Sequence, residues 1–211
     1  MVDAALIQQC ADPGLKPAIV EKFVERAGSQ DSLAVTVRFG NRVVLVPKPT
    51  TPDQAMELIR QHVGRNMVRV GITQYPAGLG VMEAGELKPD LVDACANLRM
   101  GTALFANVYR IVTKWYGNPT EKEVLPQVFD DAIIAWQTGY FEGTAVFQAP
   151  NLGEIEIPEP DPDMEKSASD AVEQSADSDV VTDPLQDEAR DDDPNKAGIR
   201  VDLSSIGAKR P

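Results

Sequence analysis

Metal-binding side chains are scarce in this sequence, whose 211 residues include two cysteines and one histidine. Cys10, Cys95 and His62 are too few and too widely spaced for a zinc site, which takes about four ligands in paired spacings. We therefore predict neither a metal nor a cofactor. We interpret His62, close to a predicted helix end, as a surface residue.

Long apolar runs are missing as well. No stretch of about 18 apolar residues occurs, so we predict no membrane span. The chain begins with an early acid, Asp3, and no apolar run of about 7 to 15 residues follows, so the pattern of a secretory leader is absent. As the sequence reads, the expected compartment is the cytoplasm; export by another route would place the protein in the periplasm.

A basic excess is absent from the first part of the chain. Residues 1–150 hold 16 acidic and 14 basic side chains, residues 151–196 hold 16 and 3, and residues 197–211 hold 1 and 3. The net charge of -13 therefore belongs to a tail. Because an almost neutral domain without a basic stripe attracts phosphates weakly, we predict no direct nucleic-acid binding.

The same part of the chain is rich in helical periodicity. Apolar residues recur at helical spacing, with caps or glycines at the ends, in the segments 15–27, 51–63, 91–115 and 120–139. Two β-branched runs, 33–37 and 42–46, are joined by four residues and predict a hairpin. The predicted fold class is mainly α (α+β), with one small β-hairpin.

The periodicity ends near residue 150, which divides the chain into three parts. Residues 1–150 form the predicted domain. Residues 151–196 are rich in acids, Ser, Pro and Ala and bury too little surface to offset their chain entropy, so we predict a disordered acidic linker. Residues 197–211 contain a short apolar motif that we expect to dock on a partner or on the domain.

Four short patterns follow one another within the predicted domain. They are Cys10-Ala11-Asp12-Pro13 before a helix, Asp31-Ser32-Leu33-Ala34-Val35, Val70-Gly71-Ile72-Thr73-Gln74-Tyr75-Pro76, and Ala135-Trp136-Gln137-Thr138-Gly139. Because these patterns occur in this order, residues 6–145 resemble the lysozyme-like lytic transglycosylase domain of type IV secretion systems. The resemblance implies a lysozyme-like fold with a substrate groove for peptidoglycan, lined by Gly71, Gln74, Tyr75, Trp136, Gln137 and Thr138.

The resemblance also implies one catalytic glutamate, which serves that family as general acid and base. Counting back from the motif Leu33-Ala34-Val35 places the glutamate at Ala27, and counting forward from the start of the predicted helix 15–27 places it at Phe23. Neither side chain can take up or release a proton. Glu25 lies two residues from either place and so on the opposite helix face. A solvated surface charge is the favoured interpretation of Glu25; the alternative is a shifted helix that brings it into the groove.

For Cys10 and Cys95 the resemblance implies a disulfide between the N-terminal segment and the central helix. A reducing cytoplasm would keep both as thiols, and the two would then serve as small buried residues.

The whole chain further resembles the TraH family of conjugal transfer proteins from large plasmids of plant-associated bacteria. We therefore predict an accessory protein of plasmid conjugal transfer (type IV secretion), with a degenerate domain that binds rather than cleaves. Its expected partners are conjugation or type IV secretion proteins, bound through the groove or the C-terminal motif, with peptidoglycan as a further candidate ligand. The alternative is an active lytic transglycosylase that uses Glu25. A third option is an acidic tail that binds a basic partner in the manner of DNA.

Overall fold

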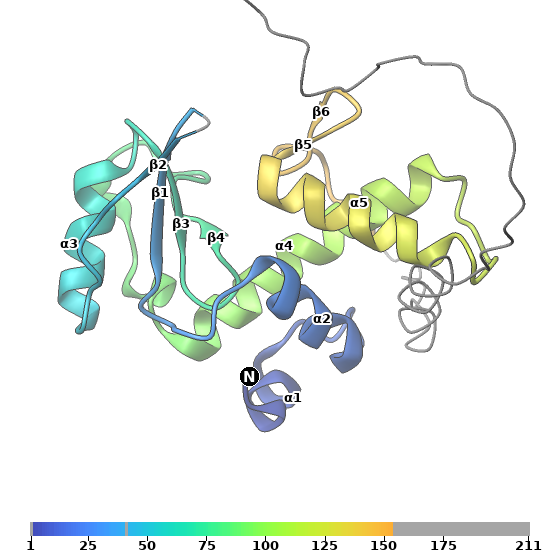
Figure 1. Ribbon diagram of the computed structural model, residues 1–211, viewed down its shortest axis with the longest axis horizontal. Helices are drawn as coiled ribbons and strands as arrows, with labels where there is room; N and C mark the ends of the chain where they lie inside the picture. The colour runs from blue at the N-terminus through green and yellow to red at the C-terminus, as the bar shows by residue number, and fades with distance from the viewer. Residues whose placement is uncertain (1, 41, 154–211) are drawn as a thin grey trace, which may run out of the picture. The chain divides into compact units, whose positions relative to one another are not determined.

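The computed structural model describes residues 2–40 and 42–153, so the predicted linker beyond residue 153 and the predicted motif at 197–211 lie outside the described residues. Helices and short strands alternate along this part of the chain (Figure 1). The helices are α1 Ala4–Cys10, α2 Pro17–Ala27, α3 Pro52–His62, η1 Ala84–Glu86, η2 Pro89–Leu91, α4 Ala94–Trp115 and α5 Leu125–Thr138. The strands are β1 Val35–Phe39, β2 Arg42–Val44, β3 Met67–Val70, β4 Tyr75–Pro76, β5 Tyr140–Phe141 and β6 Thr144–Ala145.

Local sequence explains where the longer helices begin. The side chain of Thr51 accepts a hydrogen bond from the backbone N–H of Gln54 and caps α3, and Pro52 follows at the first helical position. Asp93 caps α4 in the same way, by accepting from Ala96. Such caps satisfy N–H groups that have no partner within the helix.

A four-stranded antiparallel sheet has the strand order β2-β1-β3-β4. In the register, Val37 of β1 lies opposite Val44 of β2 and Val68 of β3. Helix α3 covers this face, and its Ile59 is buried in one cluster with Val68. Side chains alternate along a strand, so the neighbouring residues of β1 and β2 present the other face.

The apolar residues form two clusters, and α4 takes part in both. The first lies among α1, α2, α4 and α5, and contains a group of touching aromatic rings that includes Phe23, Phe105 and Trp136. The second lies between α3 and the sheet. Leu98 of α4 belongs to the first, whereas Met100 packs against the second. Figure 1 shows α4 running from the sheet to α5.

The mixture of helices with small antiparallel sheets confirms the α+β class. The prediction of one hairpin is wrong in extent, because β3 and β4 enlarge the sheet and β5 and β6 form a second one. Strand β3 is short and carries Arg69 among its apolar residues, so its pattern is weak. The last helix begins at Leu125 rather than near Thr120, with Pro126 in its first turn, where a missing N–H costs nothing.

Candidate functional site

Two segments that carry the transglycosylase-like patterns, the turn 71–75 and residues 136–138 at the end of α5, meet the end of α2 in the structure. We call the place where they meet residues 26–29 the junction. The backbone N–H of Ser29 donates to the carbonyl of Ile72 at 2.8 Å, which fixes the end of α2 on the turn.

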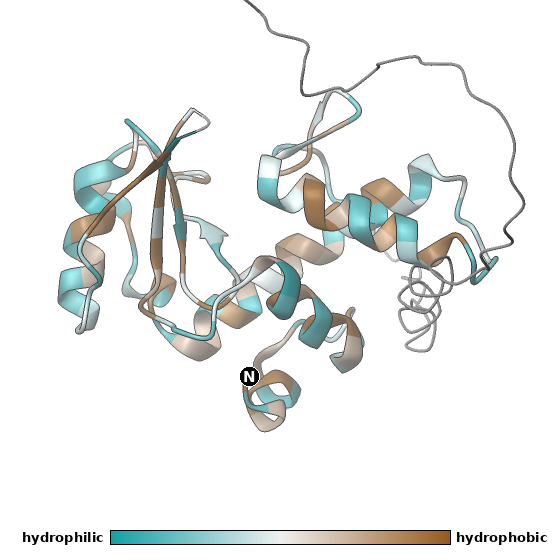
Figure 2. Cartoon of the chain, in the orientation of Figure 1, coloured by the Kyte–Doolittle hydropathy of each residue, from teal (hydrophilic) through white to brown (hydrophobic). Residues whose placement is uncertain are grey.

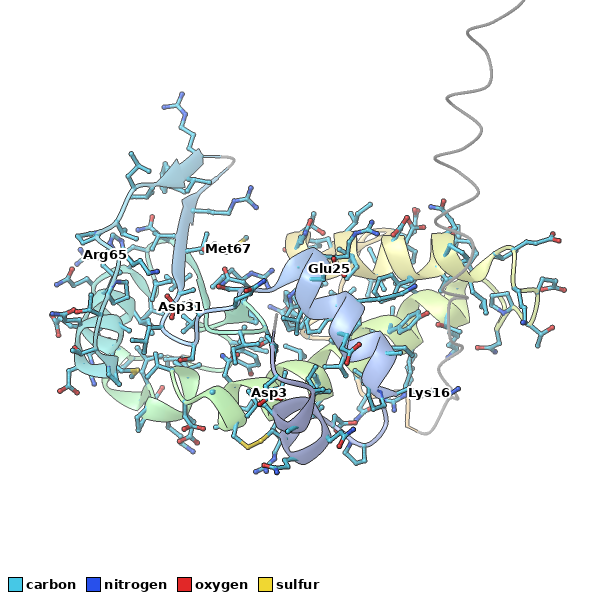
Figure 3. The ribbon with its side chains drawn as sticks, turned by 60° about the horizontal axis from the view of Figure 1, so that its bottom comes forward. Asp3, Lys16, Glu25, Asp31, Arg65 and Met67 are labelled. Atoms are coloured by element: carbon cyan, nitrogen blue, oxygen red, sulfur yellow. A yellow bond between two sulfur atoms is a disulfide. The ribbon has the colours of Figure 1, made fainter. Side chains whose placement is uncertain are left out.

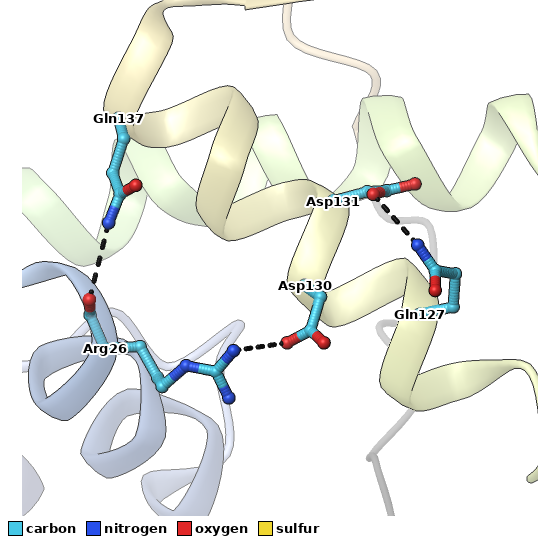
Figure 4. Close-up of polar contacts among 5 residues, drawn as sticks. All are labelled: Arg26, Gln127, Asp130, Asp131 and Gln137. Carbon is cyan, nitrogen blue, oxygen red and sulfur yellow. Dashed lines mark hydrogen bonds and ion pairs between the residues drawn. The ribbon is translucent and has the colours of Figure 1, made fainter. Parts of the chain in front are cut away.

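Helix α5 contacts α2 through a hydrogen bond and an ion pair (Figure 4). Gln137 Nε2 donates to the carbonyl oxygen of Arg26 at 3.4 Å. The guanidinium of Arg26 forms an ion pair with Asp130 at 2.8 Å, between side chains that are 44% and 46% exposed. Because the pair is solvated, it orients the two helices more than it stabilises them.

The turn has an unusual backbone that Asn97 of α4 holds in place. Gly71 has φ +73° and Gln74 has φ +52°, both in the left-handed region. Gln74 Nε2 donates to the carbonyl of Gly71 at 3.0 Å. Asn97 is fully buried, donates from Nδ2 to the carbonyl of Val70 at 3.0 Å, and accepts at Oδ1 from the backbone N–H of Thr73 at 3.0 Å. The turn is therefore a rigid, prearranged feature.

Arg69 of β3 ties the turn to the end of α5. Its guanidinium donates to three backbone carbonyls: Gln74 at 3.3 Å, Trp136 at 2.6 Å and Gln137 at 3.1 Å. It also lies 5.5 Å from the ring of Trp136 and 5.1 Å from that of Phe147. The carbonyls at a helix C-terminus carry partial negative charge, so a cation is well placed there.

Burial is the main cause that lowers the pKa of Arg69 to about 10, and the nearby charge of Arg38 lowers it further. Arg69 is 6% exposed. It therefore stays a cation at neutral pH and brings positive charge to the junction.

No carboxylate occupies the place that the resemblance gives to the glutamate. Phe23 is fully buried and stacks on Phe105, with ring centroids 4.0 Å apart. Ala27 is half-buried in the last turn of α2. Glu25 is exposed on α2 (Figure 3). A general acid of this kind lies in an apolar surrounding, whereas Glu25 is exposed to solvent.

The residues predicted to line a groove are brought together at the junction, but they differ in exposure. Gly71 and Trp136 are buried, Gln74 and Tyr75 are half-buried, and Gln137 and Thr138 are exposed. Trp136, at 1% exposure, belongs to the helical core, where its Nε1 donates to the carbonyl of Thr73 at 3.2 Å. The ring of Trp136 is therefore not accessible to a ligand. Burial raises the pKa of Tyr75.

Two residues of the junction were not predicted as site residues. Asn97 and Arg69 each carry a polar group at a buried position of an otherwise apolar pattern. Such a residue must find partners in the fold, which is the signal that sequence alone offered. Its partners here are backbone groups of distant segments, and no local pattern identifies those.

Cys10 and Cys95 are joined by a disulfide with Cα atoms 5.2 Å apart, which links the end of α1 to the first turn of α4. This is the pair that the resemblance implies, and the interpretation of both residues as thiols is wrong. Among residues 2–40 and 42–153, no group of three or more His, Cys, Asp or Glu side chains is placed to hold a metal ion. No helix in this range is long and apolar enough to cross a membrane.

The sequence matches the TraH_2 family over residues 1–208. The chain belongs to the TraH_2 family. TraH_2 membership supports a TraH-type conjugal transfer protein. A relative of Sinorhizobium fredii, named "Uncharacterized protein y4dP", is 52% identical over 212 residues, with 98% of this chain and 99% of the relative covered. No solved structure matches the chain, so the lysozyme-like assignment stays a prediction.

Proposed function

We propose that this TraH_2 protein is a non-enzymatic accessory of plasmid conjugal transfer, whose transglycosylase-like domain binds a partner. The family supports the role in conjugal transfer. The binding role is supported by the junction, which keeps a rigid glycine-glutamine turn between two helix ends. One observation carries the absence of catalysis: the place of the glutamate holds Ala27 or Phe23, and neither can transfer a proton.

The charge of the junction supports the same proposal. A lytic transglycosylase depends on one carboxylic acid, without the second acid that most glycosidases have, so nothing compensates for its loss. The junction contributes the buried cation of Arg69 instead. A buried guanidinium close to the reaction centre would favour the ionised carboxylate and so oppose a proton donor.

The experiment that tests the absence of catalysis is digestion of purified sacculi. We expect the wild-type protein to release no soluble anhydro-muropeptides, and Glu25→Gln to give the same result. Release by the wild type that Glu25→Gln abolishes contradicts the proposal and establishes the alternative, an active transglycosylase with Glu25 as general acid and base. An authentic lytic transglycosylase, digested in parallel, shows that the sacculi are susceptible.

Binding is tested separately from cleavage. In pull-downs from donor cells, we expect the chain to capture conjugation or type IV secretion proteins, through the junction or through the motif at residues 197–211. Deletion of 197–211 and the substitution Gln137→Ala, which removes one exposed amide of the junction, assign the contact to one surface or the other. If a protein with both changes still captures these partners, neither the junction nor the C-terminal motif is the binding surface. Co-sedimentation with sacculi reports whether peptidoglycan is a ligand.

A further inference from the structure

The sheet has a free edge at β2 (Figure 1). In the part of the chain that the structure describes, β2 pairs with β1 on one side and with no strand on the other. An edge strand leaves a row of backbone N–H and C=O groups available to an added strand. The free edge, Arg42–Val44, is therefore a place where another segment can add to the sheet.

Exposed apolar side chains surround this edge. Leu45 is 95% exposed, Phe39 67%, Val43 58% and Met67 44%. Figure 2 shows hydrophobic residues along β2 and the segment that follows it. Val43 and Met67 both lie opposite Arg38 in the register and so share one face of the sheet, whereas Phe39 pairs with Arg42 and lies on the other face. Exposed apolar side chains of this kind mark an interaction site.

Strands β1 and β2 contain two basic side chains, Arg38 and Arg42, and no acid. Residues 32–52, which include β1 and β2, contain Arg38, Arg42 and Lys48 and no Asp or Glu. Lys48 is paired with Asp31 at 3.1 Å, whereas Arg38 and Arg42 are exposed. The register places Arg38 opposite Val43 and Met67. An occupant of this edge should therefore carry aliphatic side chains together with carboxylates.

The chain itself contains such a segment. Residues 154–157 read Glu-Ile-Glu-Ile, and Pro158 follows. In an extended strand this alternation places both glutamates on one side and both isoleucines on the other. Strand β2 alternates in a complementary way, with Arg42 on one face of the sheet and the exposed Val43 on the other. A proline ends a pairing strand, because it lacks the N–H group.

We propose that residues 154–157 of a second copy add to the free edge of β2 as a strand. The glutamates then lie beside Arg42, and the isoleucines lie beside Val43. The occupant belongs to a second copy because Leu152, two residues before the segment, is bound to Asn107 in the middle of α4, where the backbone N–H of Leu152 donates to Asn107 Oδ1 at 3.3 Å. Strand β2 belongs to the sheet that packs on α3. The interaction makes a self-associating protein whose tails bridge neighbouring sheets.

Sedimentation equilibrium of the full chain at low salt tests the proposal. The wild type is expected to associate reversibly, and 0.5 M salt is expected to weaken the association by about tenfold because exposed charges are screened. Arg42→Glu and Glu154→Lys/Glu156→Lys should each weaken it by about tenfold, because Arg42 is the basic side chain that the proposal places beside the glutamates. An equimolar mixture of these two variants should recover it, since the charges are then complementary in one direction. Lys88→Glu, which makes the same charge change as Arg42→Glu at an exposed site elsewhere, should have no effect.

Three results overturn the proposal. The first is a chain that stays monomeric at every concentration, as docking within one copy would also give. The second is an association that neither charge-reversed variant weakens, although circular dichroism shows both to be folded. The third is a labelled single-stranded oligonucleotide that binds the wild type in an Arg38-dependent and Arg42-dependent manner and displaces the self-association, which would assign the edge to nucleic acid.

Discussion

At the scale of single residues, Gly71 carries the strongest conformational demand of the junction. Its φ of +73° suits glycine, and a Cβ placed there would lie 2.4 Å from Asn97 Nδ2. Asn97 cannot move away without losing its buried hydrogen bonds to the turn. The glycine is therefore required twice, by backbone conformation and by the close approach of α4.

We predict that Gly71→Ala lowers the free energy of unfolding by about 3 kcal/mol, the sum of backbone strain and lost hydrogen bonds. Gly80→Ala is the matched control: Gly80 has φ +71° with nothing within 4 Å of its Cβ position, so we expect a cost of about 1 kcal/mol. Urea denaturation of both variants gives the comparison. An equal decrease in the free energy of unfolding of both variants would show that the contact with Asn97 does not contribute to the cost of Gly71→Ala.

Arg69 donates to the backbone carbonyl groups of three residues, Gln74, Trp136 and Gln137. We predict that Arg69→Met lowers the free energy of unfolding by about 2 kcal/mol, because an apolar chain fills the space but leaves the carbonyls unpaired. Arg38→Met, at an exposed position of the same sheet, should change it by less than about 0.5 kcal/mol. Chemical denaturation distinguishes the two, and an Arg69→Met protein as stable as the wild type contradicts the assigned role.

Asp31 makes a contribution to the free energy of unfolding that depends on pH. A hydrogen bond from the backbone of Leu33 and one from Lys48 hold the pKa of Asp31 below its usual value. A folded-state pKa below the unfolded value means that the stabilisation is present near neutral pH and is lost as the pH falls through the folded-state pKa. We predict that Asp31→Asn costs less than about 1 kcal/mol at pH 7, because the pair is solvated, and that the cost falls as the pH is lowered and Asp31 takes up a proton. Unfolding curves at a series of acidic pH values check this, and a cost that does not change with pH contradicts it.

At the scale of elements, the disulfide joins α1 to α4 across a sequence separation of 85 residues. Closing so long a loop restricts the unfolded chain and contributes up to about 4 kcal/mol in the loop-entropy description. We predict that a reductant lowers the melting temperature of the wild type clearly and that of Cys10→Ala/Cys95→Ala not at all. Differential scanning calorimetry with and without reductant measures both. A wild type that is indifferent to reductant contradicts a stabilising bond.

The sequence predicted the elements whose signals are local. The helices at α2, α3, α4 and α5 follow from their periodicity, and Thr51 is a cap as expected. The hairpin of β1 and β2 follows from two β-branched runs. Strand β3 escaped because four residues with a buried arginine carry little pattern, and its partner β1 is distant in sequence. Helix α1 is too short for periodicity to reveal.

The candidate site was predictable only in part, for the same reason. The motifs gave the turn and the end of α5, and the structure brings both to the end of α2. The roles of Arg69 and Asn97 depend on distant backbone groups. The exposure of Trp136 was not decided by its motif, because a tryptophan serves a groove wall and a core equally well; here it is in the core.

At the scale of the whole molecule, charge is divided between a nearly neutral domain and a strongly acidic tail. The family match extends over both, since it covers residues 1–208. The basic side chains of β1 and β2 and the acidic residues after 153 are complementary in charge, which is what the proposed self-association uses.

The central claim, a non-catalytic role in conjugal transfer, is tested most directly by the plasmid transfer frequency of a donor that lacks this gene. The account predicts a loss of transfer that wild type and Glu25→Gln restore equally, while Gly71→Ala, which disturbs the junction, restores it poorly. Immunoblots confirm that each variant accumulates. Unchanged transfer without the gene, or a stable Glu25→Gln protein that fails to restore it, would contradict the account.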